Sequence, residues 1–533
     1  MNKVNRRTFL KSMVATSMLS AWGTGAKVSA ALKTGFFGIH PFIEENPDAV
    51  FIMRTSVDDK HNNTAKYKAG MAFGQSAFIS KDEGDAAFPL ASDICIKPNL
   101  TARGKWQAGY TIERSMGIVT DASFVEGVIE SMKTLGLAGE QFHLREVNAP
   151  EDLEEDGYVA VAERTGADVQ VIHTNVQDLG AEYVVWKDVE EGVWFKRIPY
   201  LWSMNAPNTF LLNIAKLKAH GMGMTLSAKN LQGTNAANFQ QHCSTYDSNM
   251  SIDYQNVHES AKETIKANYD RHVAQGIPRW DKPGQHGGIW QETWATRCLD
   301  NNSTIKPHLH VIEGIYGHDG NFIQGPHNGY AQDFLTNVII FGKNPFHVDI
   351  IGTWLAGHEP GNFGLFHLAI ERGLSTLLNP AEIPLYEWFA DGSAVQTPLE
   401  QFERTPLKTY YLQRDYNGQT EPLWHLCDEP YDYNAVAVEK KPNTIATRFD
   451  LSQNYPNPFN ASTSIRFSLP IHGHVRLEII NMNGQIVAVP ADGFFSAGVH
   501  HIVWNADRFP SGNYLYRCVF NGYTKSGRMV LIK

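Results

Sequence analysis

Lysine and histidine side chains gather in one short stretch, Asn213 to Gly233, and could bind and act on an anion. The stretch carries Lys216, Lys218, His220, Lys229 and Asn230. Ammonium groups neutralise a phosphate or a carboxylate, and an imidazole can move a proton near neutral pH. The usual alternative is a basic loop that only meets solvent. The apolar run Phe210 to Ile214 directly before the lysines predicts a buried strand, and this favours a site.

A helix is predicted after the lysines, over Met224 to Gln232, and Gly233 is its expected end. In open α/β sheets, ligands bind at the carboxyl ends of strands, where the chain passes into helices. The basic stretch therefore lies where a ligand site is expected.

Other polar residues fall at the ends of further predicted strands. Lys97 and Asn99 end one strand, Glu146 ends a second, and Glu313 follows a third. Asp349 lies in the helix after a fourth. If the sheet is parallel, these strand ends meet at one edge and form a crevice of mixed charge.

We predict three roles for these residues. The predicted catalytic residues are His220, Lys218 and Lys97. The predicted substrate-binding residues are Asn99, Lys216, Lys229 and Asn230. The candidate ligands for a hard divalent cation are Glu146, Glu313 and Asp349.

Each prediction has a simpler alternative. Lys97 and Glu146 could pair only with each other. Asp349 could cap a neighbouring loop, as a lone aspartate commonly does. Lys229 could lie on a helix surface with its stem over apolar side chains.

The order of apolar patterns predicts an α/β fold. Strands at Ile94 to Ile96, Gln141 to Val147 and Val169 to Ile172 alternate with helices, the first of which begins at the N-cap residue Asp121. This alternation is typical of a mostly parallel sheet with helices on both faces. Short alternating strands and the turn Asn483-Gly484 instead predict a C-terminal all-β sandwich of immunoglobulin-like size.

These patterns divide the chain into five parts. They are a signal peptide (1–30), the N-terminal part of the body (31–92), the α/β domain (93–376), a peripheral segment and linker (377–448) and the β-sandwich (449–533). Within the α/β domain, the polar residues 234–305 form an insertion and a candidate lid.

Composition limits the classes of function. The chain has 533 residues, 43% of them hydrophobic and 19% charged, with a net charge of −10. This composition fits a globular protein and gives no sign of a nucleic-acid partner. The five cysteines form no C-x-x-C pair, which argues against a cysteine-ligated iron–sulfur cluster and leaves a divalent metal as the cofactor to consider. The disulfide pairing is left open.

The N-terminus predicts export. Arg6-Arg7 followed by Phe9-Leu10 is similar to the twin-arginine motif, and a short apolar run and Val28-Ser29-Ala30 complete a signal peptide. No later run is long enough for a transmembrane helix. We therefore expect the twin-arginine translocase as a partner and a mature protein without a membrane span.

The tail resembles the C-terminal sorting domain of type IX secretion cargo. The residues that carry the resemblance are Leu451 to Asn460, Leu477 to Gly484, Gly498, Trp504 and Pro510 to Tyr514. The resemblance implies transport by the type IX machinery across an outer membrane, followed by release or attachment to the cell surface. The alternative is an ordinary carbohydrate-binding or adhesion module.

The body resembles the domain of unknown function 362 (DUF362) family. The carriers are Ile96 to Asn99, Thr120-Asp121, Asn213, Lys216 to His220, Ser227 to Gly233, Ile312 to Gly314, Gly325-Pro326 and Val348-Asp349. Many members carry a ferredoxin-like cysteine cluster, which this sequence lacks, and Glu313 stands where the pattern more often has aspartate.

Together these features predict an exported enzyme that acts on an anionic small molecule, a phosphate or a carboxylate, in a crevice of lysine, histidine and carboxylate side chains. The alternative is a non-catalytic protein that binds an anionic ligand or a metal at the cell surface. The sequence contains no G-x-S-x-G elbow, H-E-x-x-H pair or P-loop, so it does not indicate the familiar hydrolase, zincin or nucleotidase sites.

Overall fold

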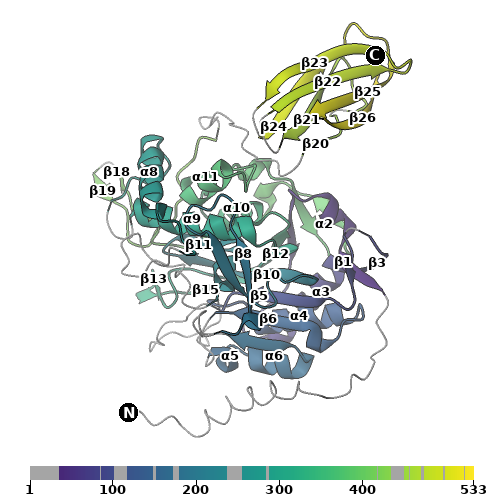
Figure 1. Ribbon diagram of the computed structural model, residues 1–533. Coiled ribbons are helices and arrows are strands. Elements are labelled where there is room, and N and C mark those ends of the chain that lie inside the picture. Colours follow the sequence, from purple (N-terminus) through teal and green to yellow (C-terminus); the bar gives the residue numbers. More distant parts are fainter. Residues whose placement is uncertain are drawn as a thin grey trace.

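The computed structural model shows an α/β body followed by an all-β tail (Figure 1). It describes residues 35–433 and 449–533, except for the internal stretches 85, 101–116, 148–151, 172–178, 237–254, 284–286, 417, 455–456, 470–472, 496–497 and 521. The predicted twin-arginine signal lies outside the described residues. Within them, no helix is both long enough and apolar enough to cross a membrane.

One mixed sheet forms the centre of the body. Its strands lie in the order β17 (Ala394–Gln396), β16 (Leu385–Trp388), β2 (Val50–Arg54), β15 (Asp333–Gly342), β12 (Leu309–His318), β10 (Thr209–His220), β5 (Asp93–Pro98), β6 (Phe142–Glu146) and β7 (Asp168–Val171). The pairs from β12 to β7 are all parallel, whereas β15 is antiparallel to both of its neighbours. The prediction of a parallel-rich α/β core is confirmed. The segments before residue 93 and after residue 376 also contribute strands to this sheet.

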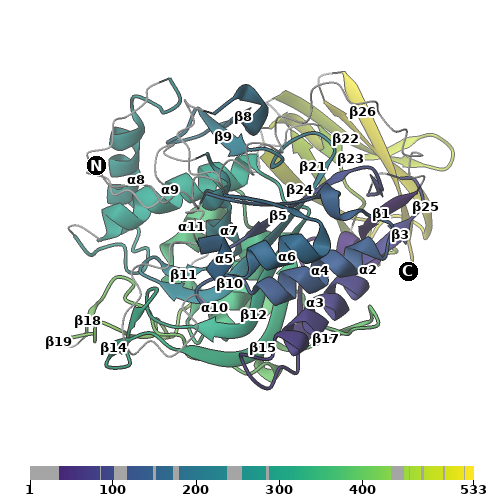
Figure 2. The same cartoon turned by 90° about the horizontal axis from the view of Figure 1, so that it is seen from below.

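Helices cover both faces of the sheet. On one face lie α3 (Asn63–Ala77), α4 (Ala122–Lys133) and α6 (Tyr158–Thr165), which Figure 2 shows side by side. On the other face, α7 (Ser227–Asn230), α9 (Gly288–Thr304), α10 (Pro345–Leu355) and α11 (Gly364–Glu371) enclose a second apolar core. Apolar strand residues alternate between these two cores, because successive side chains of a strand point to opposite faces.

The basic stretch lies on a strand that extends beyond the apolar run Phe210 to Ile214, from which a shorter strand was predicted. β10 continues through Lys216, Lys218 and His220 and then turns back to pair with β11 (Gly223–Thr225). Leu217 and Ala219 between them point into the second core. The three basic residues alternate with apolar ones at the period of a strand. This alternation predicts a strand that continues to His220, beyond the end of the apolar run.

The predicted helix from Met224 to Gln232 is also corrected. The chain there forms β11, then the single turn α7, then a 3-10 turn at Leu231–Thr234 that includes Gly233. The first predicted helix is confirmed, because α4 begins after Asp121, whose carboxylate accepts the backbone N–H groups of Ser123 and Phe124.

The predicted insertion, residues 234–305, contributes α8 (Ala261–Ala274) and α9 to the body. Most of α9 is buried, including Trp294, Cys298 and Leu299 of the second core. This helix is thus part of the body's core.

The tail consists of two antiparallel sheets. One contains β20 (Asp450–Leu451), β21 (Ser462–Leu469) and β24 (Gly498–Asn505), and the other contains β23 (Ile486–Phe495), β22 (Gly473–Asn481), β25 (Gly512–Phe520) and β26 (Tyr523–Leu531). Side chains from both sheets, among them Phe467, Leu477, Trp504 and Tyr516, share one core. This arrangement is consistent with the predicted sandwich.

Candidate functional site

The predicted residues meet at the carboxyl ends of β5, β6 and β10. Lys97 at the end of β5 donates to Glu146 at the end of β6, with 2.6 Å between Nζ and Oε2. Both side chains are buried. The ion pair between Lys97 and Glu146, which the sequence suggested as the simpler alternative, is therefore present. Lys97 also contacts other predicted site residues.

A chain of hydrogen bonds joins this ion pair to β10. Lys97 Nζ also donates to Asn230 Oδ1 at 3.1 Å, and the same oxygen accepts Asn99 Nδ2 at 3.0 Å. Asn99 Oδ1 in turn accepts Lys218 Nζ at 3.0 Å. Asn230 uses its own amide N–H groups on the Lys97 carbonyl and on Asn213 Oδ1. The two asparagines therefore hold the two lysines in fixed positions. We call Lys97, Lys216, Lys218 and Lys229, with their hydrogen-bond partners, the lysine cluster.

Lys218 is buried without a counter-charge. Its side chain is 2% exposed, and its Nζ donates only to Asn99 Oδ1 and to the Ile118 carbonyl at 2.6 Å. Among the described residues, no carboxylate lies within ion-pair distance of this amine. Burial, followed by the nearby charges of Lys229 and Lys216, places the pKa of Lys218 well below its usual value.

Lys216, two residues earlier on the same strand, is fully compensated. Its Nζ lies 2.7 Å from Glu313 Oε2, and both side chains are buried. Glu313 also accepts the backbone N–H groups of Asp121 and Ile315. Glu313 is thus saturated by one lysine and two amides, and it fixes the start of α4 against the sheet.

Lys229 belongs to α7, and Asp349 belongs to α10. Both line a small cavity of about 20 Å³, walled by Trp280, Trp294 and Phe363. Asp349 accepts the backbone N–H groups of Ser227 and Ala228, at 2.7 and 2.9 Å, so it caps α7. Burial raises the pKa of Asp349 to about 8. Lys229 is buried, and in the described part of the chain its side-chain amine makes no hydrogen bond or ion pair.

His220 lies at the last position of β10, on the same side of the strand as Lys218. Its Nδ1 accepts the Met222 backbone N–H at 3.2 Å, and its ring packs edge-on against Phe322. Its carbonyl accepts the Thr409 hydroxyl, so residues beyond the α/β core help to fix this turn.

The three candidate metal ligands serve three separate contacts. Glu146 pairs with Lys97, Glu313 pairs with Lys216, and Asp349 caps α7. Within the residues that the structure describes, no three histidine, cysteine or acidic side chains are placed to hold a metal ion.

Gly233 and Thr120 belong to the site but were not among the predicted residues. A Cβ atom at Gly233 would lie 2.3 Å from Glu146 Oε1 and 2.9 Å from Lys97 Cε, so only glycine allows this approach. Thr120 Oγ1 donates to the Ile214 carbonyl and accepts the Asn99 N–H, which ties β10 to the loop after β5. Both residues lie in the motifs that carry the DUF362 resemblance. Their place in these motifs could have identified them as site residues.

Comparison with known proteins places both parts of the chain. Residues 94–354 match the family model described as domain of unknown function (DUF362), and residues 453–533 match the one described as secretion system C-terminal sorting domain. The body is a DUF362 domain and the tail is a secretion sorting domain. The sorting domain indicates an exported protein that uses the type IX secretion machinery and reaches the cell surface or the medium.

No curated protein matches the chain. Dimeric latent PorU from Porphyromonas gingivalis is 23% identical over 16% of this chain and has a TM-score of 0.14. The matched part spans 9% of PorU. The endo-beta-1,4-mannanase from Thermotoga petrophila is 10% identical, with 80% of this chain and 85% of that chain covered and a TM-score of 0.17. Neither similarity informs the fold or the function of the DUF362 body.

Proposed function

We propose that the DUF362 body binds a small molecule through a phosphate or carboxylate group at the lysine cluster and acts on it as an enzyme. The observation that carries this proposal is the presence of two buried lysines, Lys218 and Lys229, that have no carboxylate partner among the described residues. An isolated ammonium group in the interior costs several kcal/mol. The cost is avoided if the amine loses its proton or if an anion binds beside it.

Two neighbouring buried lysines each have a carboxylate partner. Lys97 has Glu146, and Lys216 has Glu313. Lys218 lies between these pairs on the same sheet edge and has only neutral oxygen acceptors. A bound anion would provide the missing negative charge for Lys218 and Lys229 together.

Lys218 is the residue that we assign to the chemistry. The amine takes up a proton when the anion binds beside it, and it can then donate this proton to the substrate, as a general acid does. Lys97, Asn99 and Asn230 then act as positioning residues, because their donors are used within the cluster. His220 lies on the same side of β10 as Lys218 and is the second residue that we assign to proton transfer.

The second candidate is a protein that binds the same anion at the cell surface without chemistry. The hydrogen bonds of Glu146 and Glu313 favour this candidate. Because both carboxylates already accept several donors, neither is available as a general base. Turnover of a bound phosphate or carboxylate compound separates the two candidates.

The binding step is tested by calorimetric titration of the full-length exported protein with inorganic phosphate and with acetate. We expect saturable binding of at least one anion, weakened about tenfold or more by Lys218→Met and by Lys229→Met, since each change removes a charged hydrogen bond. Lys68→Met, an exposed lysine on α3, is the control and leaves binding unchanged.

Titrations in buffers of different ionisation enthalpy add a sharper test. If Lys218 is uncharged before binding, the anion draws about one proton onto it, and Lys218→Met removes that uptake. Binding that is equally strong in Lys218→Met and Lys229→Met would contradict the proposal.

For export, we propose two steps: the twin-arginine route across the inner membrane, then the type IX machinery across the outer membrane. The immunoglobulin-like character of the tail sandwich also remains a proposal. The secretion sorting domain supports the second step.

A further inference from the structure

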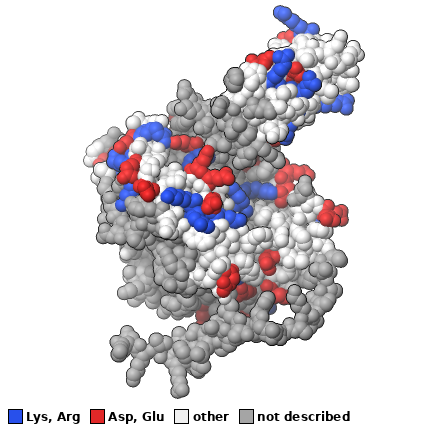
Figure 3. Space-filling model, viewed as in Figure 1, with Lys and Arg blue, Asp and Glu red and all other residues white. Residues whose placement is uncertain are grey.

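A second cavity, of about 280 Å³, opens between α8, α9, α11 and the loop around Glu190. None of the residues that line it belongs to the lysine cluster. Figure 3 shows acidic and basic side chains close together on this face of the body, over α8 and α11. The size of the cavity is sufficient for a small organic molecule.

Glu292 of α9 lines this cavity with a carboxylate whose Oε1 accepts no hydrogen bond from the described residues. The residue is 1% exposed, and its Oε2 accepts His272 Nδ1 at 2.8 Å and also Trp280 Nε1. Its Oε1 has no donor among the described residues, although the side chain lines the cavity. Because this oxygen belongs to a residue of the cavity wall, it can accept a hydrogen bond from an N–H or O–H group of a molecule bound there.

Thr296, one helical turn after Glu292, gives a second observation of the same kind. It is 4% exposed and lines the cavity, and its hydroxyl has no partner in the described part of the chain. A carboxylate oxygen and a hydroxyl four residues apart lie on the same side of a helix. Together, Glu292 and Thr296 form a polar part of the cavity wall, which we call the floor.

The fixed charges around the cavity favour a cation. His272 lies between Glu292 and Glu371, with 2.8 Å from its two nitrogens to the two carboxylates. Burial opposes its charge, but these two hydrogen bonds prevail and raise the pKa of His272. Burial also opposes the charge of Glu371, and its hydrogen bonds to His272 and Arg271 nevertheless lower the pKa of Glu371 to about 2. The hydrogen bonds of the lining therefore favour the charged forms of both groups.

The sum of the lining charges is negative. Glu190, Glu191, Glu292 and Glu371 are opposed only by His272 and Arg372. Arg372 is already paired with Asp300 at 2.6 Å. Glu190 and Glu191 are exposed at the mouth, and their carboxylates have no ion-pair partner among the described residues. An anionic ligand is therefore disfavoured here, in contrast to the lysine cluster.

We propose that this cavity binds a small organic cation through a protonated amine. The amine would donate to Glu292 Oε1 and to the Thr296 hydroxyl at the floor, and Glu190 and Glu191 would attract it at the mouth. An ammonium group supplies the missing N–H donors and the missing positive charge at once.

The probe for this site is 1,4-diaminobutane, titrated into the full-length protein at pH 7 and low salt, with 1,4-butanediol as its uncharged analogue. We expect saturable binding of the diamine to one site and no comparable binding of the diol. Absence of saturable diamine binding, or equal binding of the diol, would overturn the proposal.

Two variants locate the binding without disturbing the core. The double change Glu190→Gln and Glu191→Gln removes exposed charge and is expected to weaken diamine binding by about two- to tenfold. Thr296→Val keeps the shape of the floor and is expected to weaken it further or to a similar extent. Glu263→Gln, an exposed position of α8 that does not line the cavity, is the control. Binding unchanged in all three variants, or weakened equally in the control, would rule this cavity out.

Discussion

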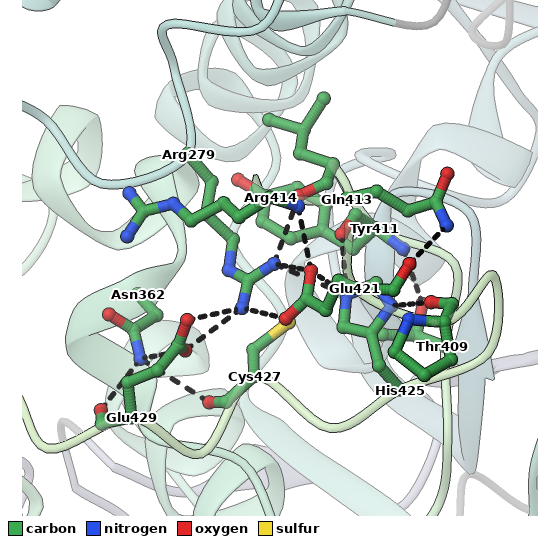
Figure 4. A network of polar contacts seen from close by, with 12 residues as sticks. Arg279, Asn362, Thr409, Tyr411, Gln413, Arg414, Glu421, His425, Cys427 and Glu429 are labelled. Atoms are coloured by element: carbon green, nitrogen blue, oxygen red, sulfur yellow. Dashed lines mark hydrogen bonds and ion pairs between the residues drawn. The ribbon is translucent and has the colours of Figure 1, made fainter. Parts of the chain in front are cut away.

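Two buried groups of charges in this protein are built in opposite ways. In the first, shown in Figure 4, Arg279 is fully buried and its guanidinium contacts Glu421 at 2.7 Å through both terminal nitrogens and Glu429 at 2.7 and 2.9 Å. It also donates to the Leu412 carbonyl at 2.9 Å. In the second, the lysine cluster, Lys218 and Lys229 have no carboxylate among the described residues.

We interpret the compensated Arg279 cluster as structural and the uncompensated lysine cluster as functional. Arg279 joins the segment after α8 to residues 412–429, which are far away in the sequence, and the carboxylates that it meets raise its pKa although burial opposes this. Such a saturated cluster leaves no role for a ligand. Counted over the described residues, the lysine cluster has an excess of positive charge, because Lys218 and Lys229 have no carboxylate partner there. Two tests of this comparison concern stability, and a third concerns pH.

The largest effect is expected where a compensated cation is removed. Lys216→Met leaves the buried Glu313 without a cation, and Arg279→Met does the same to the part-buried Glu421 and Glu429. Each change should lower the free energy of unfolding of the body by about 3–5 kcal/mol. The measurement is chemical denaturation followed by circular dichroism. The control is Lys266→Met, because Lys266 and Asp270 form an exposed ion pair on α8 worth at most about 1 kcal/mol. Losses no larger than the control's would show that these clusters are not compensated pairs.

A smaller effect is expected from Asp349, a buried carboxyl with no cation. Its pKa in the folded protein is about 8, above the ordinary value of 3.8. Because the folded pKa is raised, its stabilising contribution is complete below about pH 4 and is lost as the pH rises towards about 8. The expected slope is at most about 1.4 kcal/mol per pH unit. Asp349→Asn should remove it, and denaturation between about pH 5 and 7.5 measures the difference. Equal slopes in both proteins would mean that Asp349 is ionised throughout.

The smallest effect is expected for Lys218→Met in the absence of a ligand. No carboxylate loses its partner, and the unfavourable burial of the amine is removed along with two hydrogen bonds. The change in the free energy of unfolding should therefore stay within about 1 kcal/mol. A loss as large as that of Lys216→Met, two positions away on the same strand, would show that Lys218 carries a counter-charge.

Local sequence signals were sufficient for much of the fold. Asp121 identified the start of α4, and Lys97-Pro98-Asn99 identified the end of β5, because capping and proline geometry act over a few residues. Parallel pairing then brings Lys97, Glu146 and Lys218 to one edge of the sheet, so their proximity could be predicted. The DUF362 and sorting-domain resemblances were confirmed by the family models.

The pairing of individual charges could not be predicted in this way. Lys216 meets Glu313 because the register of β10 against β12 places them side by side, and a shift of one residue would separate them. Arg279 meets Glu421 and Glu429 across more than a hundred residues of sequence. Neighbouring residues in the sequence determine neither the distance between two such charged side chains nor their burial. Which lysines lack a counter-charge is therefore a property of the folded chain.

The central claim is that the lysine cluster needs an anion, and ligand-linked stability tests it most directly. The measurement is the free energy of unfolding of the body without and with phosphate or acetate at about 100 times the dissociation constant from the titration. The expected gain is about 2.7 kcal/mol in the wild-type protein and close to zero in the Lys218→Met, Lys229→Met double variant. No gain in the wild-type protein, or the same gain in the double variant, would contradict the account.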